Sequence, residues 1–191
     1  MAETARRPRY SLKEYLILEE MSNVRHEYLD GQIFAMAGGT PEHAGLCANL
    51  IALLSNALAG RPCRVFTSDV RVRVRATGFD TYPDATVVCG REERDADDSN
   101  ALGNPLLLVE VTSPSTEAYD RGEKLEHYKR IPSLQEVLIV AHRETRVDVW
   151  RRRRGEEWAV ESAGPEGKVR LQSLSCELAV AEIYRNPLPS D

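Results

Sequence analysis

One apolar run near the middle of the chain, Leu106 to Thr112, most limits what the sequence can fold into. Its residues are nearly all aliphatic, which is typical of a central strand covered on both faces. Glu110 interrupts the run, and burying an ionised carboxylate there costs several kcal/mol unless a cation or hydrogen bonds compensate. The sequence therefore predicts a central strand carrying one carboxylate with a partner, and a metal ion is one such partner.

The segments around this strand predict a mixed α/β fold. Ser115 to Arg130 has a helical pattern stopped by Pro132, and Glu136 to Ala141 resumes as a strand, which gives a strand–helix–strand unit. Glu42 to Ala59 predicts the best helix in the chain, because its leucines recur on one face. We therefore expect a core sheet flanked by helices, with antiparallel strands added to it.

The N-terminal half supplies further elements. Ser11 to Glu20 predicts a short helix, with Ser11 as its cap. An Asp-Gly turn at Asp30 predicts a hairpin and places Glu27 on a strand. Val65 to Arg75 alternates like a half-buried strand, and Asp80 to Cys89 predicts another strand. In the C-terminal part we expect a meander closed by a short helix.

Composition limits the class of protein. A chain of 191 residues with 42% hydrophobic residues can bury the core of one domain. No apolar segment is long enough to cross a bilayer, and Met1 to Tyr10 is not followed by the apolar run of a secretory signal, so we expect a cytoplasmic protein without a membrane partner. The four cysteines have no CxxC spacing, and we expect reduced thiols. The net charge of −5 means that nucleic-acid binding needs a local basic patch or a metal.

Two groups of arginines are candidates for such a patch. Arg71, Arg73 and Arg75 share one strand face and are the better candidates for contacts with a nucleic-acid backbone, although pairing with the many acids is the default. The run from Arg151 to Arg154 is better explained as a solvated hairpin than as a phosphate site.

Two carboxylates and one lysine suggest a chemistry. Asp84 follows Pro83 at the start of a strand, so that its carboxylate can project at a sheet end, and Glu110 lies on the apolar strand. Acids on neighbouring strands supply the oxygen ligands that magnesium prefers. Lys124, on the following helix, can orient or deprotonate an attacking water or stabilise the charge that develops on a phosphoryl group.

The order of these residues carries a resemblance. Pro83-Asp84 is followed after 26 residues by the segment from Glu110 to Thr116, and then by Asp120, Lys124 and Tyr128. With the hairpin around Glu27 and with His43 after the glycine-rich turn, this order resembles the Uma-type restriction-endonuclease-like family, within the PD-(D/E)xK nuclease superfamily. The likeness covers roughly residues 10–182, and we expect one domain over residues 1–191.

The resemblance implies a restriction-endonuclease-like mixed sheet and an Mg²⁺- or Mn²⁺-dependent endonuclease that hydrolyses double- or single-stranded DNA as a homodimer. It implies metal binding by Asp84 and Glu110 and catalytic roles for these two residues, Glu27 and Lys124. It places His43, Thr112 and Asp120 near the site or the phosphate. Thr112 stands where the superfamily usually has its lysine, and Lys124 would replace that lysine from the helix.

Other interpretations remain open. Lys124 can form an ordinary helix ion pair with Asp120, His43 can be a surface or capping residue, and Glu27 can pair with Arg25. At the level of function, the rivals are an inactive or regulatory binding module with a nuclease fold and a metal-dependent hydrolase of a small phosphate ester. No Gly-x-Ser-x-Gly elbow surrounds Ser113, so we exclude acyl transfer.

Overall fold

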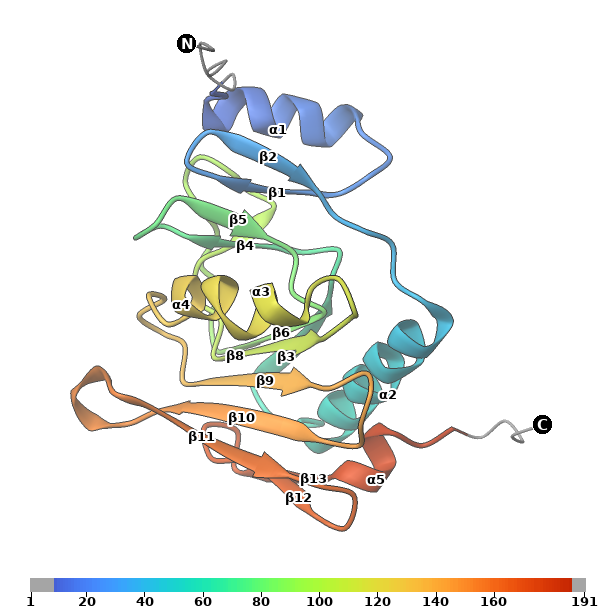
Figure 1. Cartoon of the computed structure of the whole chain (residues 1–191). Coiled ribbons are helices and arrows are strands. Elements are labelled where there is room, and N and C mark those ends of the chain that lie inside the picture. Colours follow the sequence, from blue (N-terminus) through green and yellow to red (C-terminus); the bar gives the residue numbers. More distant parts are fainter. Residues whose placement is uncertain (1–8, 187–191) are drawn as a thin grey trace.

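The computed structural model describes residues 9–186 and contains two main sheets with helices packed around them (Figure 1). Its helices are α1 (Leu12–Met21), α2 (Pro41–Ala57), α3 (Glu117–Arg121), α4 (Glu123–Tyr128), the 3-10 turn η1 (Arg154–Glu156) and α5 (Val180–Ile183). None of these helices is both long and apolar enough to span a bilayer.

Within residues 9–186, the strands form three sheets. The six-stranded sheet has the order β11 (Trp158–Ala163), β10 (Val147–Arg152), β9 (Glu136–Val140), β8 (Leu107–Val111), β6 (Ala85–Cys89) and β3 (Cys63–Thr67). The five-stranded sheet has the order β2 (Gln32–Ala35), β1 (His26–Leu29), β5 (Phe79–Thr81), β4 (Arg71–Val74) and β7 (Ala101–Leu102). A separate pair consists of β12 (Lys168–Leu171) and β13 (Cys176–Ala179).

The predicted central strand is β8, and the prediction is confirmed. All five of its residues are buried, and it lies between β6, to which it is antiparallel, and β9, to which it is parallel. The parallel pairing follows from the helical segment between β8 and β9, because a crossover connection lets both strands run in one direction. The strand–helix–strand unit predicted from the sequence is therefore present.

The six-stranded sheet is covered on both faces. Leu107 and Val109 of β8 pack with the leucines of α2 and with the C-terminal strands and α5 in one apolar cluster. Leu108 packs in a second cluster with Leu125 of α4 and with residues of β4 and β5. Successive side chains of a strand point to opposite faces, so Glu110 shares the face of Leu108 and points towards α4.

Two local motifs form as the sequence predicts. Ser11 caps α1 in a capping box, in which its hydroxyl accepts from the Glu14 amide and the Glu14 carboxylate accepts from the Ser11 amide. Asp30 and Gly31 both adopt positive φ, at 47° and 81°, in the two-residue turn that joins β1 to β2. This backbone is strained for residues with a side chain and explains why Asp-Gly marks the turn.

Three predicted elements are each divided in two. The stretch from Val65 to Arg75 forms β3 and β4 in different sheets, and the stretch from Asp80 to Cys89 likewise forms β5 and β6. The helix predicted over Ser115 to Arg130 is broken at Gly122, whose φ of −112° and ψ of −104° are not helical. A Cβ at Gly122 would lie 2.9 Å from the Ala118 carbonyl oxygen, so the sharp break between α3 and α4 depends on glycine.

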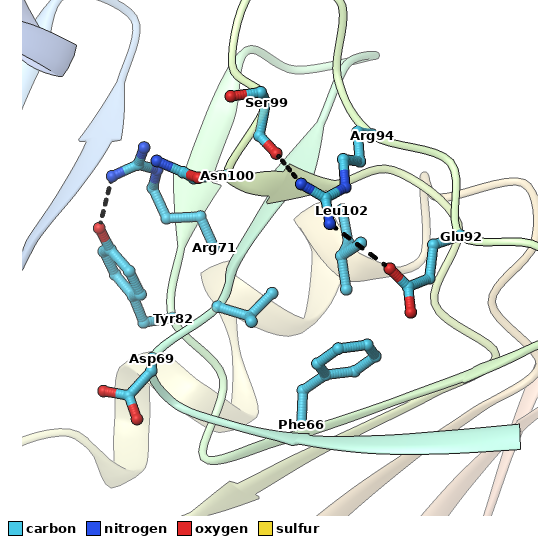
Figure 2. Close-up of a pocket in the computed structure, with 10 residues that line it drawn as sticks. Phe66, Asp69, Arg71, Tyr82, Glu92, Arg94, Ser99, Asn100 and Leu102 are labelled. Atoms are coloured by element: carbon cyan, nitrogen blue, oxygen red, sulfur yellow. Dashed lines mark hydrogen bonds and ion pairs between the residues drawn. The ribbon is translucent and has the colours of Figure 1, made fainter.

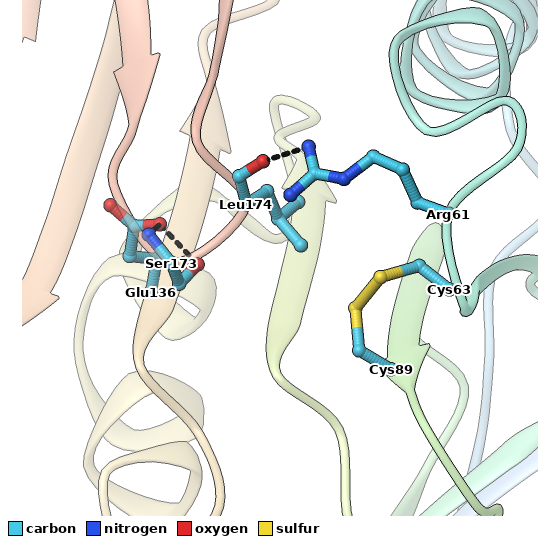
Figure 3. Close-up of a disulfide and its surroundings, with 6 residues drawn as sticks. All are labelled: Arg61, Cys63, Cys89, Glu136, Ser173 and Leu174. Atoms are coloured by element: carbon cyan, nitrogen blue, oxygen red, sulfur yellow. Dashed lines mark hydrogen bonds between the residues drawn. A yellow bond between two sulfur atoms is a disulfide. The ribbon is translucent and has the colours of Figure 1, made fainter.

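The prediction of four reduced thiols is wrong for two of them. Cys63 and Cys89 form a disulfide between β3 and β6 (Figure 3). The antiparallel register places these two residues directly opposite each other although 26 residues separate them in the chain. Cys47 and Cys176 are free. The pairing depends on strand register, which the spacing of cysteines does not reveal.

Candidate active site

A cavity of about 340 Å³ lies at the edge of the six-stranded sheet where β6 begins and β8 ends. Ala85 of β6 faces Val109 of β8, so extending the antiparallel register by one residue places Asp84 opposite Glu110. Four carboxylates and one lysine line this space, which we call the acidic cavity: Glu27, Asp84, Glu110, Asp120 and Lys124.

Lys124 pairs with three of these carboxylates, and we call Lys124 with Glu27, Glu110 and Asp120 the lysine cluster. Its Nζ atom is 3.0 Å from Glu110 Oε1, 3.2 Å from Glu27 Oε1 and 3.7 Å from Asp120 Oδ1. The side chain is 5% exposed, so these ion pairs are shielded from water. The lysine of α4 therefore reaches the two acids that come from β1 and β8, as the sequence hypothesis requires.

Glu27 is held by three different elements. Thr81 of β5 donates its hydroxyl proton to Glu27 Oε1 at 2.5 Å, and Tyr119 of α3 donates to Oε2 at 3.1 Å. With the Lys124 ammonium, both carboxylate oxygens have partners. Arg25 instead lies beside Asp69, so the alternative pairing of Glu27 with Arg25 does not occur.

Asp84 is fixed differently. Its Oδ2 atom accepts the Val111 amide at 2.7 Å and lies 3.4 Å from Nε2 of His43, on the first turn of α2. The hydrogen bond to Asp84 raises the pKa of His43, which favours the imidazolium. Asp84 therefore faces α2, and we call this side of the acidic cavity, which His43 lines, the α2 wall. Glu110 instead pairs with Lys124 on the opposite helix, α4.

Burial controls the charge of the cluster. It raises the pKa of Glu110 well above the usual range, with the Lys124 ammonium opposing the rise and the carboxylates of Asp120 and Asp84 adding to it. Burial also raises the pKa of Asp120. Burial by itself would lower the pKa of Lys124, but Glu110, Tyr128 and the other acids raise it well above the usual range, so the lysine is an ammonium ion at neutral pH.

The donor set fits a divalent cation. One lysine faces four carboxylates, and this excess of negative charge raises the free energy of ionising them all unless a cation is bound. Glu110 is bonded through Oε1, and within residues 9–186 no hydrogen bond reaches its Oε2, while Asp84 accepts the Val111 amide through Oδ2. The two carboxylates thus present hard oxygen atoms at one end of the sheet, which is the kind of ligand that a magnesium or manganese ion prefers.

The structure corrects the position that the resemblance implies for Thr112, because this residue does not lie beside the acidic cavity. Its hydroxyl lies 2.9 Å from Nδ1 of His142 and accepts the His142 amide, and Thr112 does not line the acidic cavity. The strand has ended at Val111, so the alternation that aims Glu110 at α4 does not continue to Thr112. His43 and Asp120, which the sequence placed beside it, do line the cavity.

The arginines proposed to contact nucleic acid are also a correction. Arg71 is buried and donates to both oxygens of Asp98. It also donates to the Tyr82 hydroxyl, at a separate cavity of about 250 Å³ that both residues line (Figure 2). Nη1 of Arg73 is 2.5 Å from Oδ2 of Asp80, and Nε of Arg75 is 2.7 Å from Oδ2 of Asp95. The sequence pattern gives the strand face, but the partners are Asp80 on β5 and Asp95 and Asp98 in the loop that follows β6, so the default pairing with acids applies.

Two residues to which the sequence assigns no role contact residues that line the acidic cavity. The Tyr128 hydroxyl donates to Glu110 Oε1, and the free thiol of Cys47 lies 3.6 Å from Nδ1 of His43. Helical spacing could have found both of them, because Tyr128 is four residues after Lys124 and Cys47 is four residues after His43.

Comparisons with known proteins agree with this architecture. The profile of the Uma2 family, described as "Putative restriction endonuclease", matches residues 12–182. The uncharacterized protein slr1290 of Synechocystis sp. is 37% identical over 178 residues, which is 93% of each chain. A second uncharacterized protein of this organism, sll1609, is 31% identical over 145 residues, which is 76% of this chain and 82% of its own.

One solved structure has the same fold. The crystal structure titled as that of "a putative nuclease belonging to DUF820" from Anabaena variabilis matches with a TM-score of 0.74 and 21% identity, over 91% of this chain and 97% of its own. The restriction-endonuclease-like α/β fold predicted from the sequence is therefore confirmed.

Proposed function

Because the chain belongs to the Uma2 family of restriction-endonuclease-like proteins, we propose that it is a divalent-metal-dependent endonuclease that hydrolyses DNA phosphodiester bonds. The observation that carries this proposal is the acidic cavity, in which one buried lysine faces four carboxylates at the edge of the sheet.

We assign the cation to Asp84 and Glu110, because the register places them opposite each other at the end of the sheet and Glu110 has one carboxylate oxygen without a hydrogen bond among the described residues. A bound Mg²⁺ or Mn²⁺ supplies Lewis-acid stabilisation of the charge that develops on the phosphoryl oxygens. Tyr128 and Lys124 hold the other oxygen of Glu110 and fix the orientation of its carboxylate.

Lys124 acts in this proposal as a fixed ammonium ion. Its raised pKa disfavours a role as general base and supports hydrogen bonding to an attacking water or to a phosphoryl oxygen. Glu27 holds the lysine in place at 3.2 Å and is itself held by Thr81 and Tyr119. In this proposal, Lys124 on α4 takes the role of the lysine that the superfamily usually has at the position of Thr112.

The remaining features of the proposal concern the setting of the reaction. Cutting two strands is simplest with two sites related by a two-fold axis, so we propose a homodimer. As a separate proposal, the enzyme acts in the cytoplasm. Sedimentation equilibrium tests the dimer, and fractionation of cells tests the location.

The test is cleavage of plasmid and single-stranded DNA with Mg²⁺ or Mn²⁺. Asp84→Ala and Lys124→Ala should each remove cleavage. Lys129→Ala is the matched control, since Lys129 follows the same helix and pairs with Glu126, outside the cavity. It should cleave like the wild type.

Three results would point elsewhere. Cleavage that persists in both Asp84→Ala and Lys124→Ala would overturn the assignment. Calorimetry without Mg²⁺ or Mn²⁺ binding, with Glu110 intact, would favour a binding module with a nuclease fold. Turnover of nucleotides without cleavage of polynucleotides would favour a hydrolase of small phosphate esters.

A further inference from the structure

A second group of metal-binding side chains lies on the α2 wall of the acidic cavity. His43 and Cys47 are four residues apart on α2 and therefore share one face of the helix. That face meets Asp84, the residue before β6. One nitrogen of His43, the Cys47 sulfur and one oxygen of Asp84 lie within 4.8 Å of one another.

The spacing within this group is close to that of a coordination site. In a tetrahedral zinc site, bonds of about 2.0–2.3 Å place neighbouring ligand atoms roughly 3.3–3.7 Å apart. His43 Nε2 lies 3.4 Å from Asp84 Oδ2, the other ring nitrogen, Nδ1, lies 3.6 Å from Cys47 Sγ, and with one ligand atom from each residue the three atoms lie within 4.8 Å. Because a single ring nitrogen binds the cation, the His43 or Cys47 side chain has to rotate to bring that nitrogen, the sulfur and the carboxylate around a common point.

The chemistry of the donors differs from that of the lysine cluster. Magnesium prefers oxygen ligands, whereas imidazole and thiolate select zinc and similar borderline cations. His43 and Asp84 both line the acidic cavity, so a fourth coordination position would open into it. Three protein ligands with one open position are typical of a catalytic rather than a structural zinc site.

We propose that His43, Cys47 and Asp84 bind a divalent cation of the zinc class, in addition to the Mg²⁺ or Mn²⁺ assigned to Asp84 and Glu110. Binding replaces the proton of the Cys47 thiol and, in molecules in which His43 is an imidazolium, one ring proton of His43 with the cation, and releases these protons to solvent. The inference does not depend on DNA cleavage and shares only Asp84 with the proposed function.

Cobalt is the probe, because Co²⁺ can replace Zn²⁺ and a cobalt–thiolate bond gives a charge-transfer band in the near ultraviolet. The full chain is titrated without reductant, so that the Cys63–Cys89 disulfide contributes no thiolate and only Cys47 and Cys176 are free. We expect a band that saturates at one Co²⁺ per chain, is lost on adding Zn²⁺ and persists in excess Mg²⁺.

Two matched variants locate the sulfur. Cys47→Ser should lose the band, and Cys176→Ser should keep it, because Cys176 lies on β13, away from the cavity. His43→Ala should weaken cobalt binding by roughly 100-fold. Circular dichroism confirms that each variant is folded, and if Cys47→Ser does not fold, His43→Ala tests the site alone.

The outcomes separate the two proposals. The absence of a band in folded wild-type protein, or a band that survives in Cys47→Ser, overturns the zinc-class site. Mg²⁺-dependent cleavage without the band leaves the nuclease proposal intact, whereas the band without cleavage supports the zinc-class site and counts against the nuclease.

Discussion

Glu110 and Glu136 are acids buried in adjacent strands of one sheet, yet their surroundings differ. Glu136, at the start of β9, accepts from Arg151 Nε at 2.8 Å and from the Gln172 amide at 3.1 Å through Oε1. Its Oε2 accepts from the amide and hydroxyl of Ser173, which lies beside it in Figure 3. Glu110 uses only Oε1 for its bonds to Tyr128 and Lys124. Both acids lie beside apolar residues in a strand, but of the two only Glu110 keeps an oxygen for a ligand.

The difference teaches how to recognise a functional carboxylate in a core. Burial alone does not mark a site, because Glu136 is as buried as any residue of the sheet and has partners for both oxygens. What distinguishes Glu110 is its position in a cavity that three further acids line. We therefore expect substitutions at Glu136 to change stability and substitutions at Glu110 to change activity.

The largest effect should follow from Glu136→Gln. The change removes the charge that compensates buried Arg151, and breaking a buried ion pair costs about 3–5 kcal/mol of folding free energy. Glu161→Gln is the control, because Glu161 also pairs with Arg151 but its side chain is 59% exposed, and the loss should stay below about 1 kcal/mol. Urea denaturation measures both, and equal losses would contradict the distinction.

Glu110→Gln should show the opposite pattern. Removing a preorganised charge from an active site typically lowers the rate by roughly 10²–10³-fold, and we expect such a loss in metal-dependent DNA cleavage. The folding free energy should change by less than about 1 kcal/mol, because burial already disfavours the charged form of Glu110, as its raised pKa indicates. A stability loss as large as that of Glu136→Gln would make both acids structural.

This comparison also marks the limit of what the sequence could predict. An acid within apolar residues describes Glu110 in Leu106 to Thr112, but it also describes Glu136 before Val137 to Val140. The partners that separate the two acids come from strand pairing and from loops distant in sequence. Arg151 illustrates this, since the sequence predicts a solvated hairpin for the arginine run, whereas Arg151 is buried against Glu136.

The sequence predicts an element correctly where residues close to it in the chain determine its structure. The Ser11 cap, the Asp30-Gly31 turn, the α2 helix and the central strand β8 depend on nearby residues and form as predicted. The Cys63–Cys89 disulfide depends on non-local register and was not predicted. The placement of Asp84 beside Glu110 was predicted because the order of the family motif carries that non-local information.

Asp80 sharpens the comparison as a buried acid with one unpaired oxygen but no catalytic role assigned to it. Its Oδ2 pairs with Arg73 at 2.5 Å, while Oδ1 is buried without a partner among the described residues. Burial raises the pKa of Asp80 to about 6, against the opposing charge of Arg73. Because the folded-state pKa is raised, its contribution to stability is complete below its ordinary pKa of 3.8 and is lost as the pH rises through about 6.

Asp80→Asn should remove this loss. Relative to the wild type, the variant should gain stability as the pH rises from about 4 to about 7, by up to roughly 2–3 kcal/mol. Urea denaturation across this range measures the difference, and a difference that does not depend on pH would contradict the raised pKa. Because Asp80 does not line the acidic cavity, the same substitution should leave metal binding unchanged.

The smallest effect should come from the glycine turn before α2. A Cβ at Gly39 would lie 2.9 Å from Nδ1 of His43, whereas a Cβ at Gly38 would touch nothing within 4 Å. Gly39→Ala should therefore displace the His43 ring from Asp84 and slow cleavage by about tenfold, as loss of a supporting contact at a metal ligand does. Gly38→Ala makes the same chemical change in the same turn and should cleave at close to the wild-type rate.

Kinetics with both variants, with folding checked by circular dichroism, decide whether the His43–Asp84 contact matters. Equal rates for Gly39→Ala and Gly38→Ala would mean that the α2 wall does not position Asp84 and that the lysine cluster alone defines the site. A selective loss in Gly39→Ala would extend the contrast with Glu136, because Asp84 would then depend on a side chain that a single methyl group can move, whereas Glu136 is fixed by four hydrogen bonds.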